Sequence, residues 1–360
     1  MKNRQIRRCQ KCGLPQAYPG IKFNKDNICN YCIYYFLYKD REELIKSELK
    51  SKFIKLIKDT QKKKNKYDCI VAYSGGKDST FLLSYLKSRF RLKILAHTLD
   101  NGFMSKRAMK NIKIISSTLN IDYRITRPDY KLLKDIFSYA LARRIPYPKE
   151  ILSMMSQVCA VCIGMVFGTT INTAIKLNIP LMFIGFTPGQ YPAISLENFL
   201  KVKSCMFLSH KVYRDDPLDV IKIIADPVLE QFGLRSEKYF FRSQYLPEGL
   251  SAPKVLFPFH ALLKYDERAI IAKISQLGWI KPKELDSCST NCLLNSAGNY
   301  ACLKQLGYHP YAGELGYLVR EGKISRERAI NDQGIDENSF AIRHSLRKLN
   351  ITKKQILNSK

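Results

Sequence analysis

The sequence lacks a long uninterrupted apolar run, and none approaches the roughly 18 residues that a membrane span needs. Its first residues, MKNRQIRRCQKC, are basic and no apolar stretch follows them, so we expect no signal peptide. Internal repeats and long low-complexity tracts are also missing. These absences predict a soluble, cytoplasmic protein without a membrane span.

Acidic residues are scarce. Asp and Glu number 31 against 60 Lys and Arg, which gives a formal net charge of +29. Such an excess attracts polyanions, among them nucleic acid, nucleotides and phosphorylated sugars, but it does not choose among them. The chain has 360 residues, of which 46% are hydrophobic, so it can bury a real core and is not a disordered tail.

The cysteines do not fit a disulfide framework, because their number is odd and no export signal accompanies them. Eleven occur, at positions 9, 12, 29, 32, 69, 159, 162, 205, 288, 292 and 302. We expect Cys69, Cys205 and Cys302 to be packing residues. The others form closely spaced groups, which in a reducing compartment indicate metal or sulfur chemistry.

Short apolar segments alternate with amphipathic ones in the first half of the chain. Strands are expected at 68–73, 92–99, 121–126 and 180–185, and helices at 79–90, 105–119, 129–143 and 161–177. This order predicts an α/β fold with a mostly parallel, Rossmann-like sheet covered on both faces. Residues 194–250 are expected to be irregular, and 258–350 mainly helical with a Cys-, Asn- and Gly-rich interruption at 286–303.

A glycine-rich loop follows the first expected strand and precedes a helix. It reads Ser74, Gly75, Gly76, Lys77, Asp78, Ser79 and Thr80. Adjacent glycines let the main chain approach a ligand closely, and loop amides with a helix N-terminus favour an anion. Lys77 adds a positive charge, and Asp78 could help hold Mg²⁺. The loop therefore predicts a phosphate site.

These residues resemble the PP-loop of the ATP pyrophosphatase superfamily, whose pattern is Ser-Gly-Gly-x-Asp-Ser. The resemblance implies a Rossmann-like sheet of the HUP type that binds ATP and Mg²⁺ and cleaves ATP between its α and β phosphates. An acceptor oxygen is adenylated, and a sulfur or nitrogen nucleophile then displaces AMP. It also implies nucleotide contacts at Asp100, Asn101 and Gly185, and it makes Lys77 and Asp78 catalytic candidates.

One departure from that family concerns the segment after the strand expected at 180–185. Many relatives have a Gly-His-Asn stretch there with acidic residues near the α-phosphate. This chain has Gly185-Phe186-Thr187-Pro188-Gly189-Gln190, which keeps the glycine and lacks the histidine and the acids. Metal coordination at that point therefore does not carry over.

Cys9, Cys12, Cys29 and Cys32 form two Cys-x-x-Cys pairs at a spacing typical of four-thiolate zinc sites. A module this small cannot bury a core, so bound zinc would supply its folding free energy. Residues 12–32 resemble the N-terminus of N-acetyl sugar amidotransferases, PP-loop proteins of surface-polysaccharide synthesis. The resemblance covers roughly the first 130 residues, with a weaker match at 318–327. We expect a zinc ribbon at 1–37, a connecting amphipathic helix at 38–66, the PP-loop domain at 67–200 and a mainly helical substrate region at 201–360.

Cys159 and Cys162 precede or begin a long helix, and Cys288 and Cys292 lie far along the chain. A Cys-x-x-Cys with one distant cysteine resembles the iron–sulfur PP-loop sulfurtransferases, where three cysteines hold a 4Fe-4S cluster with one open iron. On that resemblance Cys159 and Cys162 are catalytic candidates. A second zinc site formed by all four cysteines and simple packing in an apolar helix are the alternatives.

The patterns together favour an enzyme. The second cysteine group favours sulfur transfer to tRNA or to a small metabolite, helped by a sulfur-carrier partner. The N-terminal resemblance favours amidation of a nucleotide- or phosphate-linked N-acetyl sugar, with ammonia from a partner glutaminase, because this chain shows no glutaminase signature. The remaining alternative is a non-catalytic zinc-ribbon nucleic-acid binder.

Overall fold

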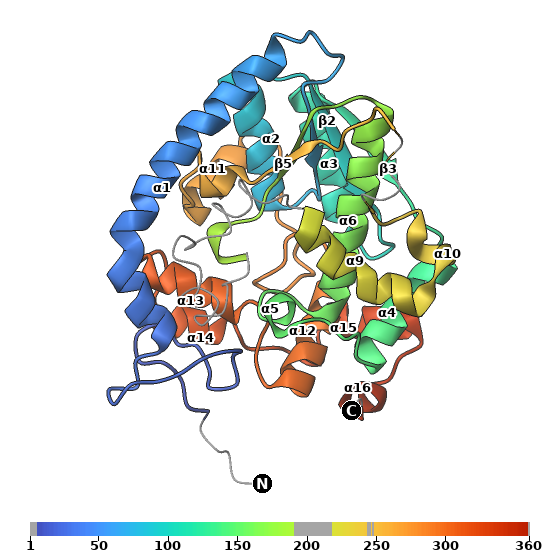
Figure 1. Ribbon diagram of the computed structural model, residues 1–360. Helices are drawn as coiled ribbons and strands as arrows, with labels where there is room; N and C mark the ends of the chain where they lie inside the picture. The colour runs from blue at the N-terminus through green and yellow to red at the C-terminus, as the bar shows by residue number, and fades with distance from the viewer. Residues whose placement is uncertain (1–5, 191–217, 243–245, 247, 359–360) are drawn as a thin grey trace.

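The centre of the molecule is a five-stranded parallel sheet with the strand order β3-β2-β1-β4-β5 (Figure 1). The computed structural model describes residues 6–190, 218–242, 246 and 248–358, without the side chains of 41–45, 188 and 218–220. The strands are β1 (Cys69–Ala72), β2 (Ile94–Leu99), β3 (Asp122–Thr126), β4 (Leu181–Ile184) and β5 (Lys254–Leu256). The predicted α/β class and its four expected strands are confirmed, each within two residues of its expected ends.

The strand order reverses beside β1, which pairs with β2 on one side and with β4 on the other. In open parallel sheets such a reversal leaves a crevice at the carboxyl ends of the two strands, where ligands bind. Ser74 follows β1 and Gly185 follows β4, so both lie at this crevice.

Alternate side chains of β1 enter different cores. Cys69 and Val71 pack with α2 (Lys77–Phe90), α3 (Lys106–Thr118) and α11 (Glu267–Ser275). Ile70 faces the opposite side and packs with α6 (Gln157–Lys176). A strand buried on both faces by apolar residues is typical of a parallel sheet between two helical layers.

A second helical group surrounds the N-terminal part of α6. It includes α4 (Tyr130–Ala142), α9 (Leu218–Phe232), α12 (Leu293–Leu306), α15 (Phe340–Leu349) and α16 (Lys353–Leu357). The short elements are α5 (Lys149–Leu152), η1 (Pro188–Gln190), α10 (Leu234–Glu237), η3 (Pro258–His260), α13 (Ala312–Arg320) and α14 (Arg326–Asn331). The mainly helical character expected after residue 258 is thus confirmed.

Two expectations about local structure were wrong. The expected interruption at 286–303 contains most of α12, whose residues from Leu293 to Cys302 are all buried. A helix buried on every side has no polar face, so no helical period marks it in the sequence. The region expected to be irregular contains α9, which tolerates Pro227 in its interior.

The cysteine-bearing N-terminal module leads into the 32-residue helix α1 (Asn30–Gln61), which runs along one edge of the molecule (Figure 1). Leu14 and Tyr18 of the module pack with Tyr308 and Ala312, near the start of α13. At the other end of α1, Phe53 packs against β4 residue Phe183. Strand β5, which belongs to the sheet, and α11, which packs against it, both come from beyond residue 200. The division into domains stays a prediction.

Helix α6 is the one helix in the described part of the chain that is long and apolar enough to cross a membrane. It has 20 residues, and 67% of its apolar window is buried inside the molecule. Its contacts with β1, β2, β4 and α9 make it the central core helix.

Candidate active site

The loop from Ser74 to Ser79, which we name the phosphate loop after its predicted role, joins β1 to α2 at the crevice. Gly76 is the N-cap of α2 and supplies no side-chain cap, so this helix end needs donors or a ligand for its first turn. Ser74 Oγ accepts a hydrogen bond from the Gly76 amide at 3.3 Å and lies 3.2 Å from Ser79 Oγ. Amides and hydroxyls that converge on a helix N-terminus suit a phosphate group.

Gly75 allows this loop to pass close to α3. Its φ is +73°, and a Cβ at this position would lie 2.6 Å from the Ala108 carbonyl oxygen. The indole Nε1 of Trp279 donates to the Gly75 carbonyl at 2.9 Å. A side chain at residue 75 would therefore push the loop away from α3, so glycine is required.

Lys77 is held by carboxylates rather than left free. Its Nζ lies 2.9 Å from Asp78 Oδ2 and 3.8 Å from Glu267 Oε1. Burial opposes its charge, but Asp78, Tyr265 and Glu314 keep the pKa of Lys77 well above its ordinary value. Lys77 is thus a charged, oriented group at the edge of the phosphate loop.

The structure brings some of the predicted nucleotide contacts to the crevice and leaves others out. Ser74, Gly76, Lys77, Asp78, Ser79, Asn101 and Gly185 line it. Thr80 is fully buried and donates to the Gly76 carbonyl at 2.8 Å. Asp100 accepts from the Gly102 amide and pairs with Arg127. Gly75, Thr80 and Asp100 therefore support the site from outside its lining.

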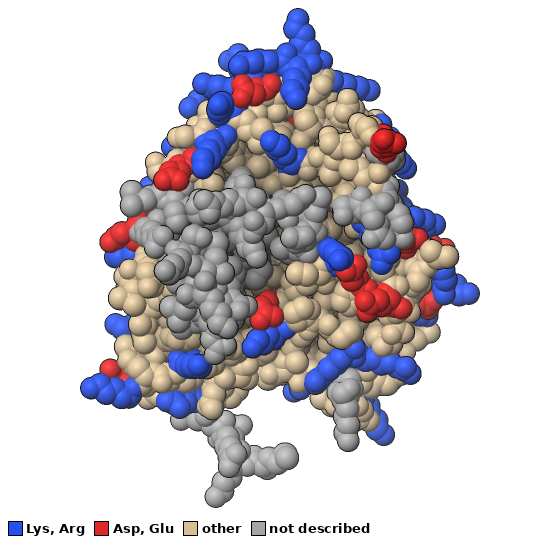
Figure 2. Space-filling model, in the orientation of Figure 1, with Lys and Arg blue, Asp and Glu red and all other residues tan. Residues whose placement is uncertain are grey.

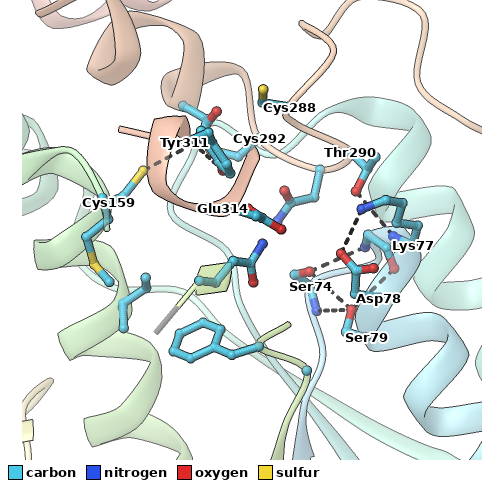
Figure 3. Close-up of a pocket in the computed structure, with 18 of the residues that line it drawn as sticks. Ser74, Lys77, Asp78, Ser79, Cys159, Cys288, Thr290, Cys292, Tyr311 and Glu314 are labelled. Atoms are coloured by element: carbon cyan, nitrogen blue, oxygen red, sulfur yellow. Dashed lines mark hydrogen bonds and ion pairs between the residues drawn. The ribbon is translucent and has the colours of Figure 1, made fainter. Parts of the chain in front are cut away.

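The crevice opens into a cavity of about 630 Å³ that extends from the phosphate loop to the N-terminal turns of α6 and α12 (Figure 3). The segment before α12 crosses to the loop, where Thr290 Oγ1 accepts from the Lys77 amide at 3.2 Å. The Leu293 amide donates to the Phe103 carbonyl at 2.9 Å, next to the end of β2. These contacts bring residues from near position 290 beside residues from near position 75.

Three cysteines, Cys159, Cys162 and Cys292, lie at the far side of the cavity, and we name them the cavity cysteines. Cys159 and Cys162 share one face of α6, and Cys292 is the N-cap of α12. Asn101 Nδ2 lies 3.4 Å from both Cys162 Sγ and Cys292 Sγ. Asn295 Nδ2 lies 3.3 Å from Cys159 Sγ. Burial raises the pKa of all three thiols, that of Cys159 to about 11.

Cys288 lines the same cavity but is oriented differently. Its Sγ faces the Asp332 carbonyl oxygen at 3.5 Å and the Ser287 hydroxyl at 3.9 Å. Figure 3 shows its sulfur pointing away from Cys159. Cys292, rather than Cys288, therefore lies with the pair on α6.

The first cysteine group, Cys9, Cys12, Cys29 and Cys32, is closed, and we name it the closed set. All four residues are fully buried, and their sulfur atoms lie within 4.8 Å of one another. Cys9 and Cys32 are 3.8 Å apart, close to the ~3.8 Å expected for two thiolates on one zinc at ~2.3 Å each. Among the residues that the structure describes, no other group of three His, Cys, Asp or Glu ligand atoms is this tight. Cys69 and Cys302, which were expected to be packing residues, are buried, and Cys205 lies outside the described residues.

Four cavity residues had no signal in the sequence: Tyr265, Glu267, Thr290 and Glu314. All come from beyond residue 250, in segments without a recognisable motif, and the fold alone brings them to the phosphate loop. Glu314 is 8% exposed, and its Oε1 accepts from the Thr187 hydroxyl at 2.8 Å. Burial raises the pKa of Glu314 above its ordinary value.

The described residues that line the cavity carry charges of both signs. On the face in Figure 2, Lys and Arg lie mostly at the top and along the edges of the molecule. Of the residues that the structure describes, four basic and five acidic side chains line the cavity, namely Lys77, Arg268, Lys323, Arg328, Asp78, Asp266, Glu267, Glu314 and Asp332.

No protein-family model matches the chain. An uncharacterized protein of Methanocaldococcus jannaschii is 24% identical over 310 residues, which are 86% of either chain. A U34-tRNA thiolase of Methanococcus maripaludis, solved with its 4Fe-4S cluster, is 15% identical with a TM-score of 0.36, covering 98% of this chain and 96% of that one. An NH3-dependent NAD synthetase of Campylobacter jejuni is 10% identical with a TM-score of 0.33, covering 76% and 93%. Likenesses at this level do not assign a family.

Proposed function

We propose that this chain is an ATP-dependent enzyme of the PP-loop superfamily that transfers sulfur to an adenylated acceptor. One observation carries the proposal: the phosphate loop and the cavity cysteines open on the same cavity. The Ser-Gly-Gly-x-Asp-Ser pattern supports it, because the pattern lies where a reversed strand order favours nucleotide binding.

The charges of the cavity are consistent with ATP that binds together with Mg²⁺. A polyphosphate is strongly anionic, and among the described lining residues the acidic ones outnumber the basic ones. Asp78 Oδ1 is buried and has no hydrogen-bond partner. Magnesium in such sites is held by one or two carboxylates together with substrate phosphates. Asp78 is therefore the residue that we assign to the metal.

The cavity cysteines fit an iron–sulfur cluster better than a second zinc. Their sulfurs are not gathered to the tight spacing of the closed set, within the part of the chain that is described. The Asn101 amide between Cys162 and Cys292 holds those two sulfurs apart. Amide donors to cysteine sulfur are a common feature of cluster sites. A 4Fe-4S cluster held by Cys159, Cys162 and Cys292 would supply an iron that can carry the sulfur to be transferred.

The chain's own residues would then act at two ends of one cavity. The loop amides, Ser74 and Ser79 bind the phosphates and orient the α-phosphorus toward the acceptor oxygen. The acceptor oxygen forms a bond to this phosphorus as the Pα–O–Pβ bond breaks and pyrophosphate leaves. A sulfur nucleophile then bonds to the activated carbon, and AMP leaves with the acceptor oxygen. Lys77 stabilises the charge that develops on the phosphates.

Nitrogen transfer to an N-acetyl sugar is the second candidate, and one observation favours it. The two segments that resemble sugar amidotransferases, 12–32 and 318–327, lie together in the fold. Arg326 Nε donates to the Cys9 carbonyl at 3.1 Å, and a Cβ on Gly13 would lie 3.7 Å from Arg326. The cysteine-bearing part of the resemblance and the segment 318–327 therefore form one structural unit.

The nature of the released phosphate tests the enzyme class. Anaerobic protein is incubated with ATP, Mg²⁺, sulfide and either an unmodified tRNA transcript or UDP-N-acetylglucosamine, and ³¹P NMR follows the products. We expect AMP and pyrophosphate in equal amounts, with loss of turnover in Asp78→Asn and little change in the exposed control Asp336→Asn. ADP and phosphate as products, or no turnover with any acceptor, would contradict the proposal. Turnover with the sugar and ammonia, instead of sulfide, would support the second candidate.

A further inference from the structure

Glu314 lies in the first turn of α13, and its carboxylate enters the middle of the cavity. Figure 3 shows it between Tyr311, on the cysteine side, and the phosphate loop with Ser74 and Asp78. Only 8% of the residue is exposed. An acceptor that reaches from the nucleotide to the cavity cysteines would have to pass this carboxylate.

The fold brings Glu314 to this place through close packing against the segment after β4. Thr187, itself 1% exposed, donates its hydroxyl hydrogen to Glu314 Oε1 at 2.8 Å. Two residues later, a Cβ on Gly189 would lie 2.6 Å from the Glu314 Cα. Only glycine at position 189 lets α13 come this near, so the contact depends on both segments.

The same segment is the one that lacks the acidic residues found in many PP-loop proteins. Here a carboxylate packs against that segment from a helix more than a hundred residues later in the chain. We propose that Glu314 is a catalytic residue that accepts the proton of the acceptor while its oxygen is adenylated. This inference rests on the proposed function and narrows it to acceptors with a secondary amide, –NH–C(=O)–.

The two acceptor classes share this group, since a uracil ring and an N-acetyl sugar each contain it. As the amide oxygen bonds to the α-phosphorus, the N–H bond breaks and its proton moves to the Glu314 carboxylate. The N–H electron pair forms a C=N bond, and pyrophosphate leaves with the electrons of the Pα–O bond. When AMP is displaced, Glu314–H returns the proton and the N–H group is restored. The step needs no oxidant or further reactant.

The surroundings of Glu314 suit a group that gains and loses a proton. Lys77 and Asp78 face it from α2, Tyr265 from the segment before α11, and Cys288 and Tyr311 from the segments before α12 and α13. Burial raises the pKa of Glu314, while Lys77 and the Thr187 hydroxyl favour its ionised form. A bound polyphosphate adds negative charge, which raises the pKa of Glu314 further; the ionised fraction of the carboxylate is then a stronger base, and part of the population takes up a proton.

Calorimetry of nucleotide binding tests this inference without any acceptor. The non-cleavable analogue AMPCPP with MgCl₂ is titrated into the protein at pH 7 in two buffers of different ionisation enthalpy, which measures proton uptake. We expect uptake by the wild type, loss of it in Glu314→Gln, partial return in Glu314→Asp, and no change in the exposed control Glu327→Gln. The affinity of Glu314→Gln for AMPCPP should stay within about threefold, because the loop makes the phosphate contacts.

Turnover provides a second readout that a merely structural role would not change. With whichever of the two acceptors supports pyrophosphate release, Glu314→Gln should lower the rate by about 10²–10⁴-fold and remove the acidic limb of the pH profile. Equal proton uptake in wild type and Glu314→Gln, or an unchanged pH profile, would overturn the inference about Glu314 and leave the proposed function standing. Absence of AMPCPP binding by the wild type would instead defeat the proposed function, and the inference with it.

Discussion

The two cysteine groups of this protein share a Cys-x-x-Cys spacing but differ in almost everything else. The four sulfurs of the closed set are fully buried and lie within 4.8 Å of one another. The cavity cysteines are partly exposed, border a space of about 630 Å³ and are separated by asparagine amides. The first arrangement has no room for a substrate, whereas the second borders an open cavity.

This difference shows that the spacing of cysteines in the sequence identifies possible metal ligands, whereas their surroundings in the fold determine the role of each site. In the closed set the second pair begins α1, so metal binding would tie the module to that helix. In the cavity, two helix N-termini present cysteines next to a phosphate loop. A structural metal belongs in the first environment and a reactive one in the second.

The largest expected effect is on the closed set. Cys12→Ser removes one of four thiolates, and zinc binding to isolated finger peptides is worth about 10–16 kcal/mol, so the module should lose its metal and unfold. Metal analysis should show less than about one tenth of a zinc per chain. Proteolysis should cut within the first 32 residues of the variant and spare the wild type. Retained zinc with an intact module would mean that the closed set is not a zinc site.

The next effect separates Cys292 from Cys288, which lie four residues apart and line the same cavity. Cys292→Ala should lower sulfur transfer at least about 100-fold and deplete bound iron, since ligand loss exceeds the 10–100-fold cost of disturbing an outer partner. Its unfolding free energy should fall by only about 1 kcal/mol. The matched variant Cys288→Ala should keep both iron and activity. The reverse result would show that Cys288 is the third ligand.

A smaller effect is expected at Asn101, whose amide nitrogen lies on two sulfurs while its Oδ1 accepts from the Phe103 amide at 2.9 Å. Asn101→Asp keeps the acceptor for Phe103 and replaces the donor with a negative oxygen. Iron affinity should fall about 10–100-fold, measured by chelator competition, with little loss of fold. If the loss is instead in AMPCPP affinity, Asn101 serves the nucleotide, as its place after β2 predicts.

The smallest effect concerns pH on the cavity side. Burial, with help from Arg124, lowers the pKa of His97 from 6.5 to about 4. The folded chain therefore disfavours protonation of His97, whereas the unfolded chain does not. The stabilisation that neutral His97 contributes is complete above pH 6.5 and declines as the pH falls toward 4. From pH 7 to 5 the loss should be about 2 kcal/mol.

Chemical denaturation at both pH values measures the effect of His97. The comparison with His97→Gln isolates it, because acid also protonates the thiolates of the closed set. An equal slope with pH in both proteins would rule out His97 as the source.

Much of the fold could be predicted because its elements have strong local signals. The strands around β1 are short apolar runs, and α3 begins at Ser105, whose hydroxyl caps the helix. Helix α12 could not be found, since its buried faces leave no period, and β5 has only three residues. Both depend on tertiary packing that no local pattern records.

The site divides in the same way. The loop from Ser74 to Ser79 and the closed set are contiguous motifs, so their residue types and spacing predict them. Glu314 and Thr290 reach the loop only through the path of the C-terminal segments. The choice between Cys288 and Cys292 likewise depended on the direction of one turn before α12, which the sequence left open.

Counting metals in protein purified without oxygen tests the central claim most directly. Iron, zinc and acid-labile sulfide are measured per chain, and the electronic spectrum is recorded before and after air exposure. The account predicts about one zinc with about four irons and four sulfides, the iron being lost in air while the zinc stays. About two zincs, or one zinc and no iron in active protein, would contradict the division between a closed and a reactive cysteine group.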